Sequence, residues 1–163
     1  MEGFRVREAV PSDARLLTDM MVEAVNWNWL QSRPRMAVLA DRDFSHYVSG
    51  WQKPGDGGCV AEGDEGSPVG ACWYRLFAAN DPGHGFLGPG VPELILGVSP
   101  LWRAQGVGRA LLDAVVTQAR TAGHARISLS VERDNYAVNL YRSAGFFRIA
   151  STGTRDTMVR TLR

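Results

Sequence analysis

The sequence lacks the cysteine content of a disulfide-stapled or zinc-binding protein. Only two cysteines occur, Cys59 and Cys72, and their spacing matches no zinc-binding pattern. We expect two free thiols in a reducing compartment, although a hairpin could bring them close enough to form a disulfide. The sequence therefore predicts no bound metal and a cytoplasmic location.

An excess of charge and a long apolar segment are also missing. Eighteen Lys and Arg nearly cancel 17 Asp and Glu, which leaves a formal net charge of +1. This balance gives no whole-molecule attraction to nucleic acid or to an anionic membrane. No apolar run approaches the roughly 20 residues needed to span a bilayer, and residues 1–6 lack an apolar signal core. We expect neither nucleic acid nor membrane as a partner.

The pattern of the 163 residues predicts one domain, residues 1–163, of mixed α/β class. No linker or internal repeat divides the chain, and residues 26–40 are too irregular to assign. Ser12 or Asp13 is expected to cap a first helix. Hydrophobic periodicity predicts further helices over 43–51, 106–122 and 135–143. It predicts strands over 3–8, 58–62, 68–78, 93–98, 126–131, 146–150 and 156–162.

Residues 80–90 are dense in glycine and proline. Four glycines and two prolines exclude a helix or strand there. The segment is either a plain connector or a loop that contacts substrate, since long loops in small domains are often functional.

The segment from Arg103 to Arg109 separates a buried strand from a long amphipathic helix. The first N–H groups of a helix have no partner within the helix, and the helix dipole adds partial positive charge there. Gly106 and Gly108 remove side chains that would keep an anion from these groups. Arg103 and Arg109 could add charge-assisted contacts. The segment favours a pyrophosphate ligand, although a glycine-rich helix start without a ligand is the structural alternative.

Three phosphate-binding motifs compete for this segment. A P-loop requires Gly-Lys-Ser/Thr, which is absent. A dinucleotide fingerprint requires a third glycine where Leu111 stands, and Glu132 lies too far along to be its ribose-binding acid. The coenzyme A signature, Gln/Arg-x-x-Gly-x-Gly/Ala, is satisfied by Arg103, Gly106 and Gly108.

Two separated blocks make the chain resemble the GCN5-related N-acetyltransferase (GNAT) superfamily. The first runs from Glu93 to Pro100 and continues through the Arg103–Leu112 segment. The second, residues 134–146, contains the pattern Asn…Leu-Tyr…Gly-Phe. The resemblance covers the whole chain through the order of strands and helices. Many members have Arg where Gln105 stands. The glutamine of this chain provides no cation there but leaves the backbone amides in place.

The resemblance implies a splayed, mostly antiparallel central sheet flanked by helices. It implies acetyl-CoA as the cosubstrate, no metal, and a pantetheine arm that enters between strands 93–98 and 126–131. The residues that it implies for cofactor binding are Leu96, Gly97, Val98, Arg103, Ala104, Gln105, Gly106, Val107, Gly108, Arg109, Asn135 and Tyr141. Gly97 also fits a site where a backbone or ligand approaches closely, or a simple bulge.

The resemblance further implies direct acetyl transfer to an amine. Tyr141 is the candidate general acid for the departing thiolate, and a backbone N–H near Val98 would stabilise the developing oxyanion. Glu93 is the first candidate for the base that deprotonates the amine. Asp81, His84 and Glu132 are weaker candidates for this base.

The acceptor is harder to read from the sequence. Aromatic residues could line a small, partly apolar acceptor pocket or fill the core, namely Trp27, Trp29, Trp51, Trp73, Tyr74 and Phe86. We expect a small-molecule or peptide amine as the acceptor and consider a homodimer. The alternatives are a non-catalytic acyl-CoA-binding module on the same fold and, more weakly, a nicotinamide-dependent oxidoreductase.

Overall fold

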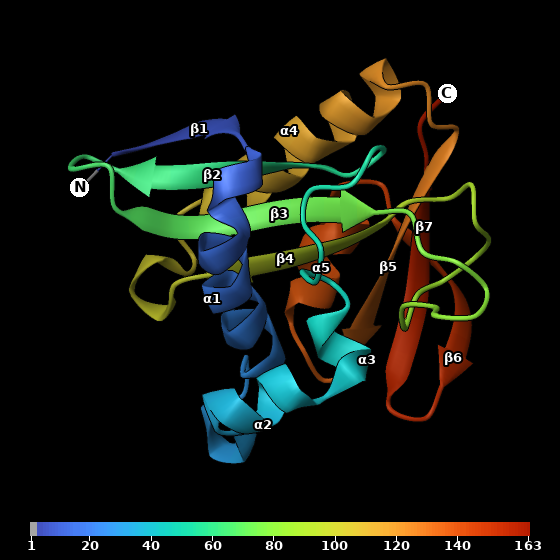
Figure 1. Ribbon diagram of the computed structural model, residues 1–163, viewed down its shortest axis with the longest axis horizontal. Coiled ribbons are helices and arrows are strands. Elements are labelled where there is room, and N and C mark those ends of the chain that lie inside the picture. Colours follow the sequence, from blue (N-terminus) through green and yellow to red (C-terminus); the bar gives the residue numbers. More distant parts are fainter. Residues whose placement is uncertain (1–2) are drawn as a thin grey trace.

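A computed structural model describes residues 3–163 and contains one seven-stranded sheet (Figure 1). Its strand order is β1-β2-β3-β4-β5-β7-β6. The strands are β1 Phe4–Glu8, β2 Gly57–Gly63, β3 Pro68–Arg75, β4 Glu93–Val98, β5 Arg126–Glu132, β6 Phe147–Thr152 and β7 Arg155–Thr161. Each neighbouring pair is antiparallel except β4 and β5, which are parallel. The predicted mixed α/β fold with a mostly antiparallel sheet is therefore confirmed.

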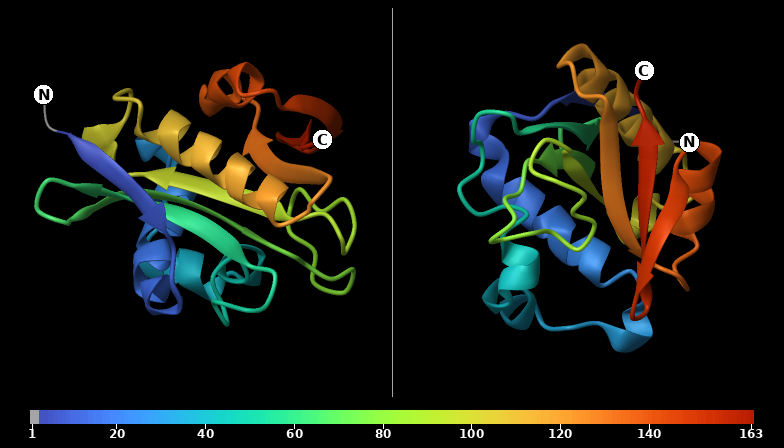
Figure 2. Two further views of the ribbon diagram at one scale, coloured as in Figure 1. Left: turned by 90° about the horizontal axis from the view of Figure 1, so that it is seen from above. Right: turned by 90° about the vertical axis from the view of Figure 1, so that its right-hand side faces the viewer.

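Helices cover both faces of the sheet, as Figure 2 shows in its left view. The first three helices lie on one face, and the last two lie on the other. The helices are α1 Ala14–Val25, α2 Arg35–Ala40, α3 Arg42–Ser45, α4 Val107–Thr121 and α5 Ala137–Ser143. One apolar cluster lies under α4 and α5, and a second lies between the sheet and α1 to α3. Burial of these two apolar clusters is the main favourable term that holds the helices to the sheet.

The sheet splays between β4 and β5. The two strands share a single register position, Glu93 opposite Ser128. Beyond it β4 stays paired with β3 as far as Val98, which lies opposite Gly70. The other edge of residues 96–98 therefore has no strand partner from β5, and the predicted splay is confirmed.

Gly97 is explained by the packing of α1 on β4. A Cβ atom on Gly97 would lie 2.0 Å from the Met20 carbonyl oxygen of α1. Its register opposite Ala71 is regular, so the bulge considered from the sequence is wrong. Close approach of a backbone, the other alternative, accounts for the glycine.

The predicted helix over 43–51 is wrong in length, because α3 ends at Ser45 and turns follow it. The Arg75 guanidinium donates hydrogen bonds to the carbonyl oxygens of His46 and Ser49 at 3.1 and 2.6 Å. Gly50 then adopts a φ of +74°. Carbonyl groups that a regular helix would use are thus directed at a buried arginine. Helix α2 lies within residues 26–40, for which the sequence pattern predicted no element.

The other element boundaries lie within a few residues of the prediction, with β3 ending at Arg75 rather than at residue 78. Cys59 and Cys72 lie directly opposite one another on β2 and β3, and both are buried free thiols. Burial raises the pKa of both, to about 11 for Cys59. No helix within residues 3–163 is both long and apolar enough to cross a membrane.

Candidate active site

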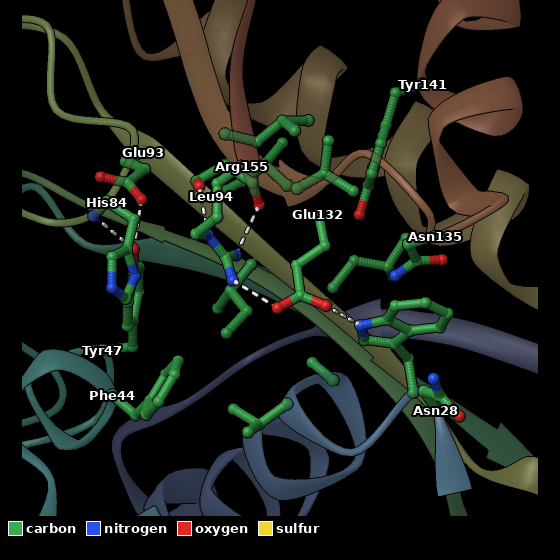
Figure 3. A pocket seen from close by; sticks show the side chains of 18 of the residues that line it. Asn28, Phe44, Tyr47, His84, Glu93, Leu94, Glu132, Asn135, Tyr141 and Arg155 are labelled. Carbon is green, nitrogen blue, oxygen red and sulfur yellow. Dashed lines mark hydrogen bonds and ion pairs between the residues drawn. The ribbon is translucent and has the colours of Figure 1, made fainter. Parts of the chain in front are cut away.

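Two cavities meet beside the splay of the sheet. The first, which we call the α4 groove, has a volume of about 310 Å³ and lies between the end of β4, the start of α4 and α5. The second, the central cavity, has a volume of about 300 Å³ and lies between α1, α3 and strands β4, β5 and β7 (Figure 3). Both cavities are lined by Ala24, Trp27, Leu96, Asn135 and Tyr141. A ligand in one cavity can therefore reach a ligand in the other.

The start of α4 presents backbone groups to the α4 groove. Gly106 precedes the helix with a φ of +87°, a left-handed conformation that glycine adopts without steric cost. No side chain caps the helix, so its first amides have no partner from a capping residue. Ala104 also has a positive φ, +61°. This strained turn leaves helix amides available to an anionic ligand.

Most of the residues predicted to bind the cofactor line the α4 groove. They are Leu96, Gly97, Val98, Arg103, Ala104, Gly106, Gly108, Arg109, Asn135 and Tyr141. The side chains of Gln105 and Val107 do not line the groove. Gln105 donates a hydrogen bond to the Leu101 carbonyl oxygen at 2.9 Å, and Val107, the first residue of α4, is buried in the core. Any contact of these two residues with a ligand in the groove would have to come from their backbone.

Both arginines of the motif already have protein partners. Arg103 donates to the Val98 carbonyl oxygen at 3.3 Å and lies 3.7 Å from the Glu23 carboxylate. Arg109 pairs with Asp113 at 3.2 Å on the helix surface. Exposed pairs of this kind are weak, so either guanidinium can turn toward a phosphate at small cost.

Asn135 and Tyr141 lie where the two cavities join. The Asn135 side-chain oxygen accepts a hydrogen bond from the Ala137 amide at 2.9 Å, which leaves its NH₂ group directed elsewhere. Tyr141 is 7% exposed, and burial raises the pKa of its hydroxyl. Within residues 3–163 no hydrogen bond occupies that hydroxyl, which therefore keeps its proton at neutral pH and can donate it.

Glu93 begins β4 and is 1% exposed, although it lines the central cavity. The Tyr47 hydroxyl donates a hydrogen bond to Glu93 Oε2, and the Gly85 amide donates a second at 3.1 Å. A Cβ atom on Gly83 would overlap Glu93 Oε1, so the loop needs glycine there. The loop of residues 80–90 and the turn that follows α3 thus hold the carboxylate in one orientation.

Burial sets the protonation of this carboxyl group. Desolvation raises the pKa of Glu93 from 4.5 to about 7, against opposing contributions from the Tyr47 and Gly85 hydrogen bonds and the Arg155 charge. A group with a pKa near the working pH can both take and release a proton. Glu93 has this property, and its Oε1 atom makes no hydrogen bond within the described residues.

The three weaker base candidates occupy different places. Asp81 lies outside the cavity lining and pairs with the buried His46 at 3.1 Å. His84 does line the central cavity, where desolvation lowers the pKa of its ring. Glu132 lines it as well, and its Oε2 accepts a hydrogen bond from the Trp27 indole at 2.8 Å. The structure therefore places two of the three in the cavity that Glu93 also lines.

The suggested aromatic acceptor pocket is mostly wrong. Of the six aromatics considered, only Trp27 lines either cavity. Trp29 is 79% exposed, and Trp51, Trp73 and Tyr74 are buried in the core. The aromatic lining of the central cavity is instead Phe44, Tyr47 and Tyr141 beside Trp27, among many polar groups.

Sequence reasoning missed several residues of the central cavity. Tyr47 fell within the predicted helix over 43–51, but nothing in the sequence indicated that its hydroxyl would bond to Glu93. Arg33 and Arg155 have no motif around them. Arg155 reaches the cavity only because β7 pairs with β5 so that Arg155 lies opposite Glu132.

Comparison with known proteins identifies the family. A sequence model described as the acetyltransferase (GNAT) family matches residues 19–146, which is most of the chain. The chain belongs to the GNAT acetyltransferase family. The resemblance found in the two sequence blocks is therefore confirmed.

Curated relatives of this GNAT protein include two mycothiol acetyltransferases. That of Saccharomonospora viridis is 32% identical over 148 residues, which is 89% of this chain and 46% of the relative. That of Propionibacterium freudenreichii is 34% identical over 147 residues, 89% of this chain and 43% of the relative. The chain thus spans less than half the length of these relatives.

Solved structures support the fold. The structure of SsHAT matches with a TM-score of 0.73 at 18% identity and covers 99% of both chains. A GNAT acetyltransferase from Staphylococcus aureus matches with a TM-score of 0.72 at 15% identity and covers 99% of this chain and 100% of that one. PaiA N-acetyltransferase from Thermoplasma acidophilum, solved with coenzyme A, has a TM-score of 0.70 at 15% identity, with 98% and 99% covered. At these identities the likeness shows the fold alone.

Proposed function

We propose that this GNAT protein transfers an acetyl group from acetyl-CoA to the primary amine of a small acceptor. One observation carries the proposal: the α4 groove and the central cavity join at Tyr141, and Glu93 lines the second of them. Proton donor and proton acceptor thus face a space that two substrates can enter from different sides. We therefore call the central cavity the acceptor cavity.

The residues of the α4 groove fit coenzyme A. The uncapped start of α4 and the left-handed Gly106 suit a pyrophosphate, with Arg103 and Arg109 as flexible cations. The unpaired edge of residues 96–98 suits the amide groups of the pantetheine arm. Asn135 has an NH₂ group available to the same arm. Bound acetyl-CoA would supply the thioester whose carbonyl carbon the amine attacks.

Glu93 would act as the base. An alkyl amine with a pKa near 10.4 is almost entirely protonated at pH 7 and cannot attack. Because its pKa is about 7, a large share of Glu93 is ionised at neutral pH and accepts the proton, directly or through a water. Tyr47 and Gly85 hold the accepting carboxylate in place.

Tyr141 would supply the opposite proton transfer. Its hydroxyl stays protonated because burial raises its pKa, and it lies where the thiol of the cofactor would leave. It therefore donates the proton that the departing sulfur requires. A backbone N–H near Val98 would donate a hydrogen bond to the thioester oxygen.

The experiment is thiol release from acetyl-CoA across a panel of amines, with coenzyme A binding measured by calorimetry. Glu93→Gln should reduce kcat about 100-fold or more, the usual share of a general base, and leave coenzyme A affinity unchanged. Turnover at the wild-type rate in this variant would remove Glu93 from the mechanism.

The alternative is a non-catalytic acyl-CoA-binding module, which the same experiment tests. Tight binding of acetyl-CoA without thiol release on any amine would favour the module and overturn the proposal. The homodimer stays a separate prediction, which size-exclusion chromatography with light scattering would check.

A further inference from the structure

The charged groups that line the acceptor cavity restrict the amine that can bind, an inference that rests on the proposed function. Among the described lining residues, the charged side chains are Arg33, Glu93, Glu132 and Arg155. In the proposed function Glu93 accepts the proton of the amine, and Glu132 already accepts a hydrogen bond from the Trp27 indole. A polyamine or aminoglycoside would therefore meet two guanidinium groups and find no free carboxylate. The cavity disfavours polycationic acceptors.

Arg155 is held in place with part of its donor set free. Its Nε donates to Ser130 Oγ at 2.8 Å, and Nη2 donates to the Ser130 carbonyl oxygen at 3.3 Å. Nη1 has only the ion pair with Glu132 Oε1, at 3.8 Å, beyond hydrogen-bond distance. Residues 3–163 make no hydrogen bond and no other ion pair with Nη1. A guanidinium fixed on one edge and open on the other is suited to a carboxylate.

The position of Arg155 relates this free edge to the reacting groups. In Figure 3 the Arg155 side chain lies between Glu93 and Glu132. Burial is the largest influence on the pKa of Glu93 and of Tyr141 and raises both, while the positive charge of Arg155 lowers them in part. An anion bound at Arg155 would therefore lie near the amine that Glu93 deprotonates.

We propose that the acceptor is a free α-amino acid whose carboxylate binds the open edge of the Arg155 guanidinium. In such an acceptor a single carbon separates amine and carboxylate, which matches a cation placed beside the catalytic base. A cavity of about 300 Å³ suits a molecule of this size rather than a folded protein segment. Arg33, on the loop after α1, also lines the cavity, but its guanidinium is paired with Asp41 at 3.3 Å, so Arg155 is the cation with a free donor edge.

The test compares the 20 common L-amino acids with their carboxamides and with spermidine as acceptors, by thiol release from acetyl-CoA. Wild type should use at least one amino acid with a kcat/KM about tenfold or more above that of its carboxamide, as expected when a charge-assisted hydrogen bond is lost. Arg155→Met should abolish this preference, measured as the ratio of kcat/KM for the amino acid to kcat/KM for its carboxamide, because any effect of the substitution on Glu93 acts on both acceptors alike. Arg126→Met is the matched control, because Arg126 is an exposed arginine at the far end of β5.

The outcomes separate this inference from the proposed function. Equal or better use of carboxamides or spermidine would overturn the amino-acid inference and leave acetyl transfer intact. An equal loss of preference in Arg126→Met would also overturn it. Binding of acetyl-CoA with no turnover on any amine would overturn the proposed function itself, and the inference with it. Retained preference in Arg155→Lys would support recognition through charge.

Discussion

The Tyr47 hydroxyl donates a hydrogen bond to the Glu93 carboxylate across the acceptor cavity. Tyr47 follows α3, and Glu93 begins β4, so the bond joins the helical layer to the central strand (Figures 1 and 3). The same hydroxyl accepts a hydrogen bond from the His84 amide at 3.0 Å. One phenol therefore fixes both the candidate base and the loop over it.

Tyr47→Phe should shift the pH dependence of kcat/KM to higher pH. In the proposed mechanism Glu93 acts as a base when ionised, so the wild-type rate should rise with pH through about 7 and then level off. The Tyr47 hydrogen bond lowers the pKa of Glu93, and its loss should raise the midpoint by about one pH unit. A rate profile from pH 5.5 to 9.5 measures this shift. An unchanged midpoint would mean that another group controls the profile.

Glu93→Gln should become more stable than wild type as pH rises. The folded pKa of Glu93, about 7, lies above the ordinary value of 4.5, so the folded state binds this proton more tightly than the unfolded state. The stability of wild type therefore falls between these two values and stays lower above pH 7. The free energy of unfolding of Glu93→Gln minus that of wild type should grow by about 3 kcal/mol from pH 4 to pH 8.

Urea unfolding at several pH values measures this difference. Glu65→Gln, which removes an exposed carboxyl in the β2–β3 turn, controls for the change in net charge. A difference between Glu93→Gln and wild type that does not change with pH would show that Glu93 is not desolvated in the folded protein.

Tyr141→Phe should slow acetyl transfer without weakening the binding of coenzyme A. The substitution removes only the hydroxyl, and the ring keeps its edge contact with Phe146 at a centroid distance of 6.1 Å. General acids contribute about 100-fold or more, so kcat should fall by roughly that factor. Acceptors that yield the same kcat in variant and wild type would show that the sulfur leaves without a proton from Tyr141.

The start of α4 could be predicted from the sequence because its signals are local. The apolar stripe of α4 and the glycines at 106 and 108 lie in one continuous segment, and the structure places most of that segment in the α4 groove. The splay also followed, through the family resemblance carried by residues 93–112 and 134–146.

The acceptor cavity could not be read in the same way, because its groups come from distant segments. Arg155 reaches it through the β5–β7 register, and Glu93 gains its raised pKa from burial under a loop and the α3 segment. Neither the pairing of strands nor desolvation leaves a pattern in neighbouring residues. The same limit explains the short α3, because the carbonyl groups of His46 and Ser49, which follow it, accept hydrogen bonds from Arg75 of β3.

Gly106→Ala should weaken coenzyme A binding by more than its effect on stability explains. A Cβ at Gly106 meets no atom within 4 Å, so the folded protein accommodates it, but the φ of +87° is strained for alanine by about 1 kcal/mol. Relief of that strain would turn the amides at the start of α4 away from the groove. The dissociation constant should therefore rise about tenfold.

Gly123→Ala is the matched control for this change, because Gly123 lies just beyond the other end of α4 with a φ of +94° and equally open space. Both variants should lose similar stability in thermal unfolding, while calorimetry should show weaker coenzyme A binding for Gly106→Ala alone. Equal affinities in the two variants would place the pyrophosphate away from the start of α4, and the assignment of the α4 groove to the cofactor would then fail.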